Sequence, residues 1–238
     1  MAMSIKYKRI LLKLSGEALS GDKGTGFDEP TLEEICKGIK AAHDLGAQIG
    51  IVVGGGNFWR GRSSGRMERT CADKIGLLAT VMNCLAVSDM LRQLGLETSV
   101  QTALFMPQVA DPFVRDEAVA ALEAGKVVLF GAGTGNPFFS TDTASALRAI
   151  EIGADIMFKA TMVDGVYDKD PKKYPDAVKY ETLTFSRVLA DKLAVMDSTA
   201  ATLCRDNGLP ILVFDMGDSG NIARAVNGED LGTLVSEN

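Results

Sequence analysis

The chain has 238 residues, of which 46% are hydrophobic and 24% charged, the composition of an ordinary globular protein long enough for a large core. Its net charge of -6 argues against broad binding of nucleic acid, although a small anionic ligand needs only a locally positive pocket. No apolar run approaches the roughly 20 residues of a membrane span, and four scattered cysteines with one histidine, His43, exclude most zinc sites and favour reduced thiols in the cytoplasm.

Five short apolar runs predict buried strands. They are "KRILLKL" (8–14), "AQIGIVV" (47–53), "KVVLF" (126–130), "ADIMFKA" (154–160) and "LPILVFDM" (209–216). Strands of this kind that alternate with helical patterns indicate a mostly parallel sheet covered by helices on both faces. With no repeat, low-complexity tract or evident linker, we expect one α/β domain over residues 1–238, built as a three-layer sandwich.

Two segments show helical spacing. Leu32, Ile35, Cys36 and Ile39 recur at helical spacing in the first segment. The segment 73–95 carries two apolar faces, one with Ile75, Leu78, Met82 and Leu85, the other with Leu77, Val81, Cys84 and Leu91. A helix that is apolar nearly all round is buried on both sides. It is either a central core helix or a helix whose second face packs on another copy of the chain.

Glycine follows three of the predicted strands, in "KLSGEAL" (13–19), "VVGGGNFWRG" (52–61) and "FGAGTGNPFFSTD" (130–142). In open α/β sheets, ligands bind at the carboxyl ends of the strands, and glycine lets backbone N–H groups approach an anion. Tight turns without a ligand would explain any one loop, but explain three less well. No GxxxxGK[ST] occurs, and "GAGTGN" lacks the third glycine of GxGxxG, which disfavours P-loop and dinucleotide-binding proteins.

Two lysines, Lys13 and Lys159, interrupt apolar strands near their ends. Such a position is costly unless the charge is used or reaches solvent. Together the two could flank a phosphoryl group in transfer, a reaction that depends on positioning and charge more than on a catalytic histidine or cysteine. Asp142 either orients a lysine or a magnesium-bound phosphate, or is an ordinary acid in the first turn of a helix.

The segment "KATMVDGVYDKDP" (159–171) predicts a further polar loop with turns at Asp164-Gly165 and Asp170-Pro171. It is either a surface hairpin or a clamp for a nucleotide base, with Tyr167 as the flat surface. The two phenylalanines of the stretch 130–142, Phe138 and Phe139, suggest a second place for a flat base.

These motifs, taken together, make the chain resemble the bacterial uridylate (UMP) kinases of the amino-acid kinase superfamily. The resemblance covers nearly the whole chain, through "YKRILLKLSGEAL", "VVGGGNFWRG", "LLATVMN", "GAGTGNPFFSTD", "ADIMFKATMVDGVYDKDP" and "LAVMD" in order. It implies the amino-acid kinase fold and phosphorylation of UMP to UDP by ATP, in pyrimidine nucleotide biosynthesis, through direct in-line transfer. "GTGNPFFSTD" is its most specific part, because it separates UMP kinases from relatives that phosphorylate carboxylates or carbamate.

The resemblance also implies site residues. The lysines would stabilise the transferring phosphoryl group and two acids would organise charge, so the implied catalytic residues are Lys13, Lys159, Asp142 and Asp197. ATP would contact Lys13, Leu14, Ser15, Gly16, Gly56, Arg60, Thr161, Tyr167 and Asp170. UMP would contact Gly55, Asp73, Thr134, Gly135, Asn136, Pro137, Phe138, Phe139, Ser140 and Thr141.

Partners and regulation follow from the same resemblance. Mg²⁺ would enter with ATP, held mainly by the phosphates, and the chain would form a homohexamer, a trimer of dimers. Many bacterial members are activated by GTP and inhibited by UTP. The segment linked to GTP activation corresponds here to Gly21, Asp22, Lys23, Gly24, Thr25 and Gly26. Met162 departs from the family, which usually has lysine at that position.

Two rival interpretations stay open. The first is an aspartate, glutamate or carbamate kinase on the same fold, which Phe138 and Phe139 disfavour because a small aliphatic acceptor gives aromatic rings nothing to stack on. The second is a binding protein that stores oxyanions without catalysis. The retention of Lys13, Lys159 and the full donor loop favours catalysis.

Overall fold

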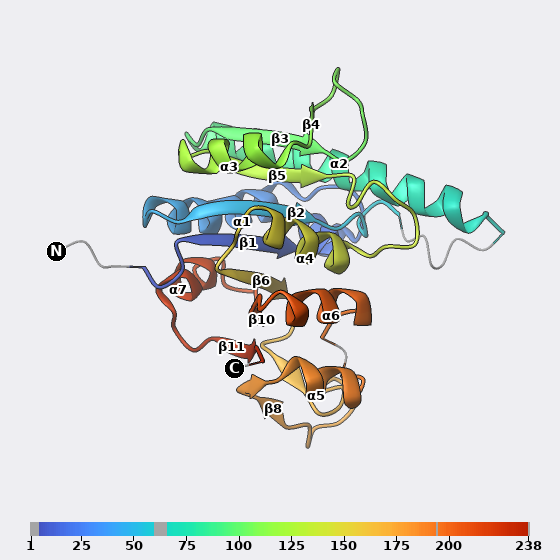
Figure 1. The fold of residues 1–238 in the computed structure, drawn as a ribbon, viewed down its shortest axis with the longest axis vertical. Helices are drawn as coiled ribbons and strands as arrows, with labels where there is room; N and C mark the ends of the chain where they lie inside the picture. The colour runs from blue at the N-terminus through green and yellow to red at the C-terminus, as the bar shows by residue number, and fades with distance from the viewer. Residues whose placement is uncertain (1–4, 60–65, 194, 238) are drawn as a thin grey trace.

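A nine-stranded, mostly parallel sheet runs through the part of the chain that the computed structural model describes, residues 5–59, 66–193 and 195–237 (Figure 1). The strand order is β4-β3-β5-β2-β1-β6-β10-β11-β9. Neighbours from β4 to β10 pair in parallel, and β11 pairs antiparallel with β10. The strands are β1 (Arg9–Leu14), β2 (Gln48–Val53), β3 (Thr98–Thr102), β4 (Asp111–Pro112), β5 (Val127–Gly131), β6 (Ile156–Thr161), β9 (Thr182–Leu183), β10 (Ile211–Asp215) and β11 (Gly232–Val235). The five predicted strands are confirmed as β1, β2, β5, β6 and β10.

Helices cover both faces of the sheet, which confirms the predicted three-layer α/β fold. One face carries α1 (Glu29–Asp44), α2 (Arg69–Gln93) and α7 (Asn221–Asn227). The other carries α3 (Arg115–Glu123), α4 (Thr141–Glu151), α5 (Phe185–Ala190) and α6 (Ser198–Asp206). A 3-10 segment, η1 (Gly16–Lys23), follows β1, and β7 (Val166–Tyr167) pairs with β8 (Lys179–Tyr180) in a separate antiparallel sheet.

Alternation along β1 decides where its lysine points. Ile10, Leu12 and Leu14 belong to the core under α1 and α2, whereas Leu11 belongs to the core under α4 and α6. Since successive side chains of a strand point to opposite faces, Lys13 shares the side of Leu11 and faces α4. The fold therefore places this charge under the N-terminus of a helix.

The helices that border the carboxyl ends of the strands begin at residues that favour helix starts. The side chain of Ser140 accepts a hydrogen bond from the Thr143 N–H at the start of α4 (3.0 Å). Asp197 does the same for the Ala200 N–H at the start of α6 (3.1 Å). Such caps satisfy N–H groups that the helix itself leaves unpaired. They fix both helix ends beside β1 and β6.

Helix α2 is buried on one apolar face only. Leu77, Val81 and Cys84 are buried, whereas Leu78 and Met82 are 45% and 43% exposed. The interpretation of 73–95 as a core helix covered on both sides within one chain is therefore wrong. By length and composition α2 could cross a membrane, but 56% of its most apolar stretch is buried inside the fold, as expected for a helix that packs one face on the sheet. Figure 1 shows its N-terminal half extending past the carboxyl ends of the strands.

Candidate active site

The carboxyl ends of β1, β2, β5 and β6 surround a cavity of about 620 Å³, called here the central cavity. Glycine loops form part of its wall and the two phenylalanines another part. It brings together most of the residues that the sequence singled out. These are Lys13, Ser15, Gly16, Gly55, Gly56, Asp73, Asn136, Phe138, Phe139, Ser140, Thr141, Asp142, Lys159 and Asp197.

Lys13, Asp142 and Lys159 form a buried charge cluster in this cavity. Lys13 and Lys159 are register partners on the adjacent strands β1 and β6. Lys13 Nζ lies 2.9 Å from Asp142 Oδ1, and Lys159 Nζ lies 2.6 Å from Asp142 Oδ2. Lys159 also donates a hydrogen bond to the carbonyl of Val195. The interpretation of Asp142 as an acid that orients the lysines thus fits the structure, and it sits in the first turn of α4 as well.

The cluster holds two positive charges against one negative charge. Burial alone would raise the pKa of Asp142, but the ammonium groups of Lys13 and Lys159 outweigh it and lower that pKa. Burial lowers the pKa of Lys159, and the nearby Lys13 adds to this, while Asp142 and Asp197 act in the opposite direction. With both lysines charged, the cluster carries one net positive charge and suits an anion that enters the cavity.

Asp197 supports the cluster from a distance. Its carboxylate accepts hydrogen bonds from the Ser140 hydroxyl and from Thr143 Oγ1 (3.0 Å), in addition to capping α6. These bonds tie the start of α4, which carries Asp142, to the start of α6. Asp197 therefore positions Asp142 and does not pair directly with a lysine in the structure.

The first two glycine loops approach each other closely. A Cβ added to Gly16 would lie 2.2 Å from the Gly54 carbonyl oxygen, so only glycine fits there. Behind this contact, the buried amides of Asn57 and Asn83 donate to each other (3.0 and 2.8 Å), and Asn83 also donates to the Gly54 carbonyl (2.6 Å). The glycine triplet is therefore held rigidly against α2 by a satisfied buried network.

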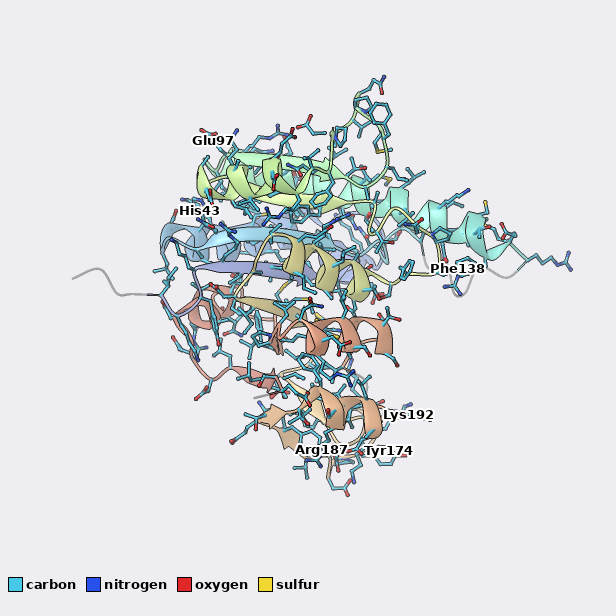
Figure 2. The ribbon with its side chains drawn as sticks, in the orientation of Figure 1. His43, Glu97, Phe138, Tyr174, Arg187 and Lys192 are labelled. Carbon is cyan, nitrogen blue, oxygen red and sulfur yellow. The ribbon has the colours of Figure 1, made fainter. Side chains whose placement is uncertain are left out.

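The loop after β5 is held in an unusual conformation. Ala132 and Phe138 have φ angles of 61° and 73°, in the left-handed region that favours glycine. The Ala132 N–H donates to Thr80 Oγ1 (2.9 Å), and the Phe138 N–H donates to Asp73 Oδ2 (2.8 Å). Phe138 stays 63% exposed beside the N-terminal half of α2 (Figure 2). An exposed ring at the rim of a polar cavity is available to stack on a flat ligand.

A second cavity of about 490 Å³, the Tyr167 cavity, adjoins the first. It is lined by Thr161, Tyr167 and Asp170, three of the residues expected to contact ATP. Tyr167 donates a hydrogen bond to Asp164 Oδ1 (2.7 Å) in the turn that the sequence predicted. Lys159 and Val195 line both cavities. The two spaces therefore meet at the charge cluster.

Some expected site residues lie elsewhere. Leu14 is buried in the core, and Thr134 lines a separate cavity beside α4 and α6. Gly135 and Pro137 do not line the central cavity in the described structure. Arg60 falls outside the described residues, so its expected contact with ATP stays a prediction.

The segment expected to respond to GTP borders a further cavity of about 900 Å³, the Met162 cavity. Gly21, Asp22 and Gly24 line it together with the exposed Met162. The rest of the segment contacts its neighbours: Lys23 pairs with Asp28 (3.2 Å), and Thr25 Oγ1 and the Gly26 N–H both donate to the Asn57 carbonyl (3.0 Å each). The segment therefore contacts the glycine triplet loop directly.

Sequence reasoning missed several residues that the structure places at the site. Trp59, Arg69 and Thr80 line the central cavity. Arg69 and Asp73 stand four residues apart on a helix, a spacing that could have revealed their ion pair. His43 lies at the opposite end of the sheet from Phe138 (Figure 2), with Nε2 2.8 Å from the Gly125 carbonyl, so it takes no part in this site.

No group of three or more histidine, cysteine, aspartate or glutamate side chains suited to a metal ion occurs within residues 5–59, 66–193 and 195–237. Both oxygens of Asp142 face lysines, and Asp197 accepts bonds from α4 and α6. A divalent cation in this site would therefore have to bring most of its ligands with it.

Comparisons with known proteins agree with this geometry. Residues 8–215 match the model of the amino acid kinase family. UMP kinase from Bacillus anthracis superposes with a TM-score of 0.95 at 39% identity, over 98% of this chain and 97% of that one. UMP kinase from Ureaplasma parvum gives 0.90 at 34% identity (97% and 99% covered), and uridylate kinase from Archaeoglobus fulgidus gives 0.73 at 29% (95% and 99%). The chain belongs to the amino acid kinase family and, within it, to the group of UMP kinases.

Proposed function

We propose that the chain transfers the terminal phosphoryl group of ATP to UMP, giving ADP and UDP. One observation carries the proposal: Lys159, which shares the carboxylate of Asp142 with Lys13, lines both the central cavity and the Tyr167 cavity. A phosphoryl group that passes between a donor in one cavity and an acceptor in the other would pass beside this lysine. The similarity to proteins named UMP kinases supports UMP as the acceptor.

The central cavity suits a pyrimidine nucleotide. Phe138 and Phe139 provide aromatic surface for the uracil, and Asp73 provides a carboxylate for ribose hydroxyls. Gly55, Ser140 and Thr141 would hold the phosphate near the N-terminus of α4, where backbone N–H groups and the helix dipole favour an anion. Thr134, Gly135, Asn136 and Pro137 would shape the rest of this loop around UMP.

The Tyr167 cavity suits the donor. Thr161, Tyr167 and Asp170 would hold the adenosine part of ATP. Lys13, Ser15, Gly16 and Gly56, which line the central cavity, would contact its phosphates. A contact of Arg60 with ATP is part of the same proposal, whereas one with the buried side chain of Leu14 is not. Mg²⁺ would arrive with ATP and be held mainly by phosphate oxygens, because the carboxylates of the site are already paired. When bound, it would neutralise charge on the donor phosphates.

The proposed reaction is an in-line displacement. An oxygen of the UMP phosphate forms a bond to the γ-phosphorus of ATP, while the bond from that phosphorus to the β–γ bridging oxygen breaks and ADP leaves. Negative charge spreads over the transferring group in the transition state, where Lys13 and Lys159 offset it. Asp142 holds both ammonium groups, one at each oxygen of its carboxylate, and Asp197 fixes Asp142.

The proposal also covers the location of the enzyme in the cell, its assembly and its regulation. We infer a cytoplasmic enzyme, which the four free cysteines support. We infer a homohexamer built from dimers, and the exposed Leu78 and Met82 of α2 offer an apolar face for a second copy. Regulation by GTP and UTP stays a proposal, supported by the contact of the segment 21–26 with Asn57.

ADP release from Mg-ATP across a panel of acceptors tests the proposed function. The panel holds UMP, CMP, dUMP, aspartate, glutamate and carbamate, with an acceptor-free reaction as the control. We expect turnover with UMP far above that with every other acceptor. Turnover only with a carboxylate or carbamate would overturn the assignment of the acceptor. ATP binding without turnover would instead favour a binding protein.

A further inference from the structure

Two side chains of α2 hold the loop after β5 at the two residues other than glycine that adopt a left-handed conformation there. Thr80 accepts the N–H of Ala132, and Asp73 accepts the N–H of Phe138. A left-handed conformation is unfavourable for residues other than glycine, and it persists only where neighbouring groups enforce it. One helix therefore supplies an acceptor at each end of the segment 132–138.

Asp73 is in turn held by Arg69, one helical turn before it. Arg69 Nε lies 2.8 Å from both carboxylate oxygens of Asp73. The guanidinium carbon of Arg69 lies 5.6 Å from the centre of the Phe138 ring. One guanidinium thus contacts both the ring of Phe138 and the carboxylate that binds the N–H of Phe138.

The stability of α2 does not explain an arginine at this position. Arg69 is the first residue of the helix, where the helix dipole favours negative charge. An arginine that precedes its aspartate by four residues is also in the weaker order for such a pair. Glu68 already caps the helix by accepting the N–H groups of Thr70 and Cys71. The contacts of Arg69 with the loop after β5 therefore explain an arginine at this position, whereas helix stability does not.

We infer that Arg69 is a positioning residue of the acceptor site. It orients Asp73 and covers Phe138, so that the loop keeps the turn that places the Phe138 ring at the wall of the central cavity. The inference rests on the proposed function, because UMP is the molecule that this wall is proposed to bind. A guanidinium is needed, since its Nε and its planar face act at once and a lysine ammonium has no such face.

The first test is Arg69→Gln in the full chain, with KM for UMP, KM for ATP and kcat measured separately. We expect KM for UMP to rise about tenfold, while kcat and KM for ATP change less than about twofold. Arg69→Lys should give an intermediate KM for UMP. An unchanged KM for UMP, or equal increases in both KM values, would overturn the inference.

A matched control lies on α5. Arg187→Gln also removes a pair with an aspartate four residues later, Asp191 (3.2 Å), and a cation–ring contact with Tyr180 (4.9 Å). Figure 2 shows Arg187 and Phe138 in different parts of the molecule. We expect this variant to leave KM for UMP unchanged. A tenfold increase in it would overturn the assignment to Arg69, because any such pair would then have the same effect.

A double-mutant cycle tests whether Arg69 acts through Phe138. Phe138→Gly removes the ring and supplies a residue that takes the left-handed conformation freely. In that background we expect Arg69→Gln to raise KM for UMP about threefold or less. The full tenfold increase would overturn the inference while leaving UMP as the substrate. If the unaltered protein phosphorylates no UMP, the proposed function fails first and the inference fails with it.

Discussion

Lys13 and Lys159 are paired residues on adjacent parallel strands, and their ammonium groups contact opposite oxygens of one carboxylate, that of Asp142. Two positive charges that contact the same carboxylate lie close together and would repel each other strongly in a buried site. The shared carboxylate keeps them together without cancelling the net positive charge. An anion that enters between the lysines completes the neutralisation, which is the condition that phosphoryl transfer requires.

Removing Lys13 should therefore slow the reaction without unfolding the protein. We expect Lys13→Met to lower kcat about 10²- to 10³-fold, because one of two groups that offset transition-state charge is lost. Asp142 stays paired with Lys159, so the melting temperature should change little. Lys8→Met, an exposed lysine just before the same strand, is the control and should keep full activity. Retention of most of kcat in Lys13→Met would remove Lys13 from the mechanism.

The pH dependence of kcat should depend on Asp142. The pKa of Lys159 is lowered, so the charged form is lost as pH rises through a value below the usual 10.5. The carboxylate of Asp142 opposes that lowering. Asp142→Asn should therefore move the alkaline fall in kcat to lower pH, and should reduce kcat as well. A pH profile of the variant that coincides with that of the unaltered enzyme would contradict this assignment.

The stability of the fold at low pH gives a second test of the role of Asp142. The pKa of Asp142 in the folded protein lies below its ordinary value of 3.8. Its ionisation therefore stabilises the fold above pH 3.8, and this contribution is lost as pH falls from 3.8 through the lowered pKa. Urea titrations between pH 2 and pH 5 should show a steeper loss of stability for the unaltered protein than for Asp142→Asn. Equal slopes would mean that Asp142 is not held ionised by its lysines.

The sequence predicted the centre of this sheet and missed its edges. Strands β1, β2, β5, β6 and β10 are continuous apolar runs because they are buried on both faces. Strand β3 reads "TSVQT" and β11 has only four residues, so neither shows such a run. Strands β3 and β11 lie next to the two-residue edge strands β4 and β9, and all four are short or partly polar, so their pairing partners define them more than their own residues do.

The same limit applies to the site. The sequence placed Lys13 and Lys159 at strand ends, but only the register between β1 and β6 makes them neighbours. Arg69 and Asp73 are close in sequence, whereas the bond from Asp73 to Phe138 joins residues 65 positions apart. Spacing along the chain reveals contacts within one helix. It does not reveal which loop the helix will hold.

Thiol labelling should distinguish one cysteine from the other three. Cys36, Cys84 and Cys204 are buried, and burial raises the pKa of each thiol to about 12, whereas Cys71 is exposed. At pH 8 we expect a disulfide reagent to react quickly with one thiol per chain and with four after denaturation. Cys71→Ser should abolish the fast reaction. Fast labelling of a second thiol would contradict the packing of α1, α2 or α6.

Thr80 offers a test of how the loop after β5 is held. Thr80→Val keeps the shape of the side chain but leaves the buried N–H of Ala132 without its acceptor. We expect a loss of about 1–3 kcal/mol in the free energy of unfolding, measured by urea titration. Thr182→Val, at an exposed threonine on β9, is the control and should change stability by less than about 0.5 kcal/mol.

Ala132→Gly separates the lost hydrogen bond from backbone strain. It should stabilise the unaltered protein slightly by removing left-handed strain, because glycine takes that conformation without a clash. Added to Thr80→Val, Ala132→Gly should restore little of the lost free energy of unfolding, since the N–H of residue 132 stays unpaired. A full recovery would mean that strain, and not the lost hydrogen bond, is what Thr80 offsets.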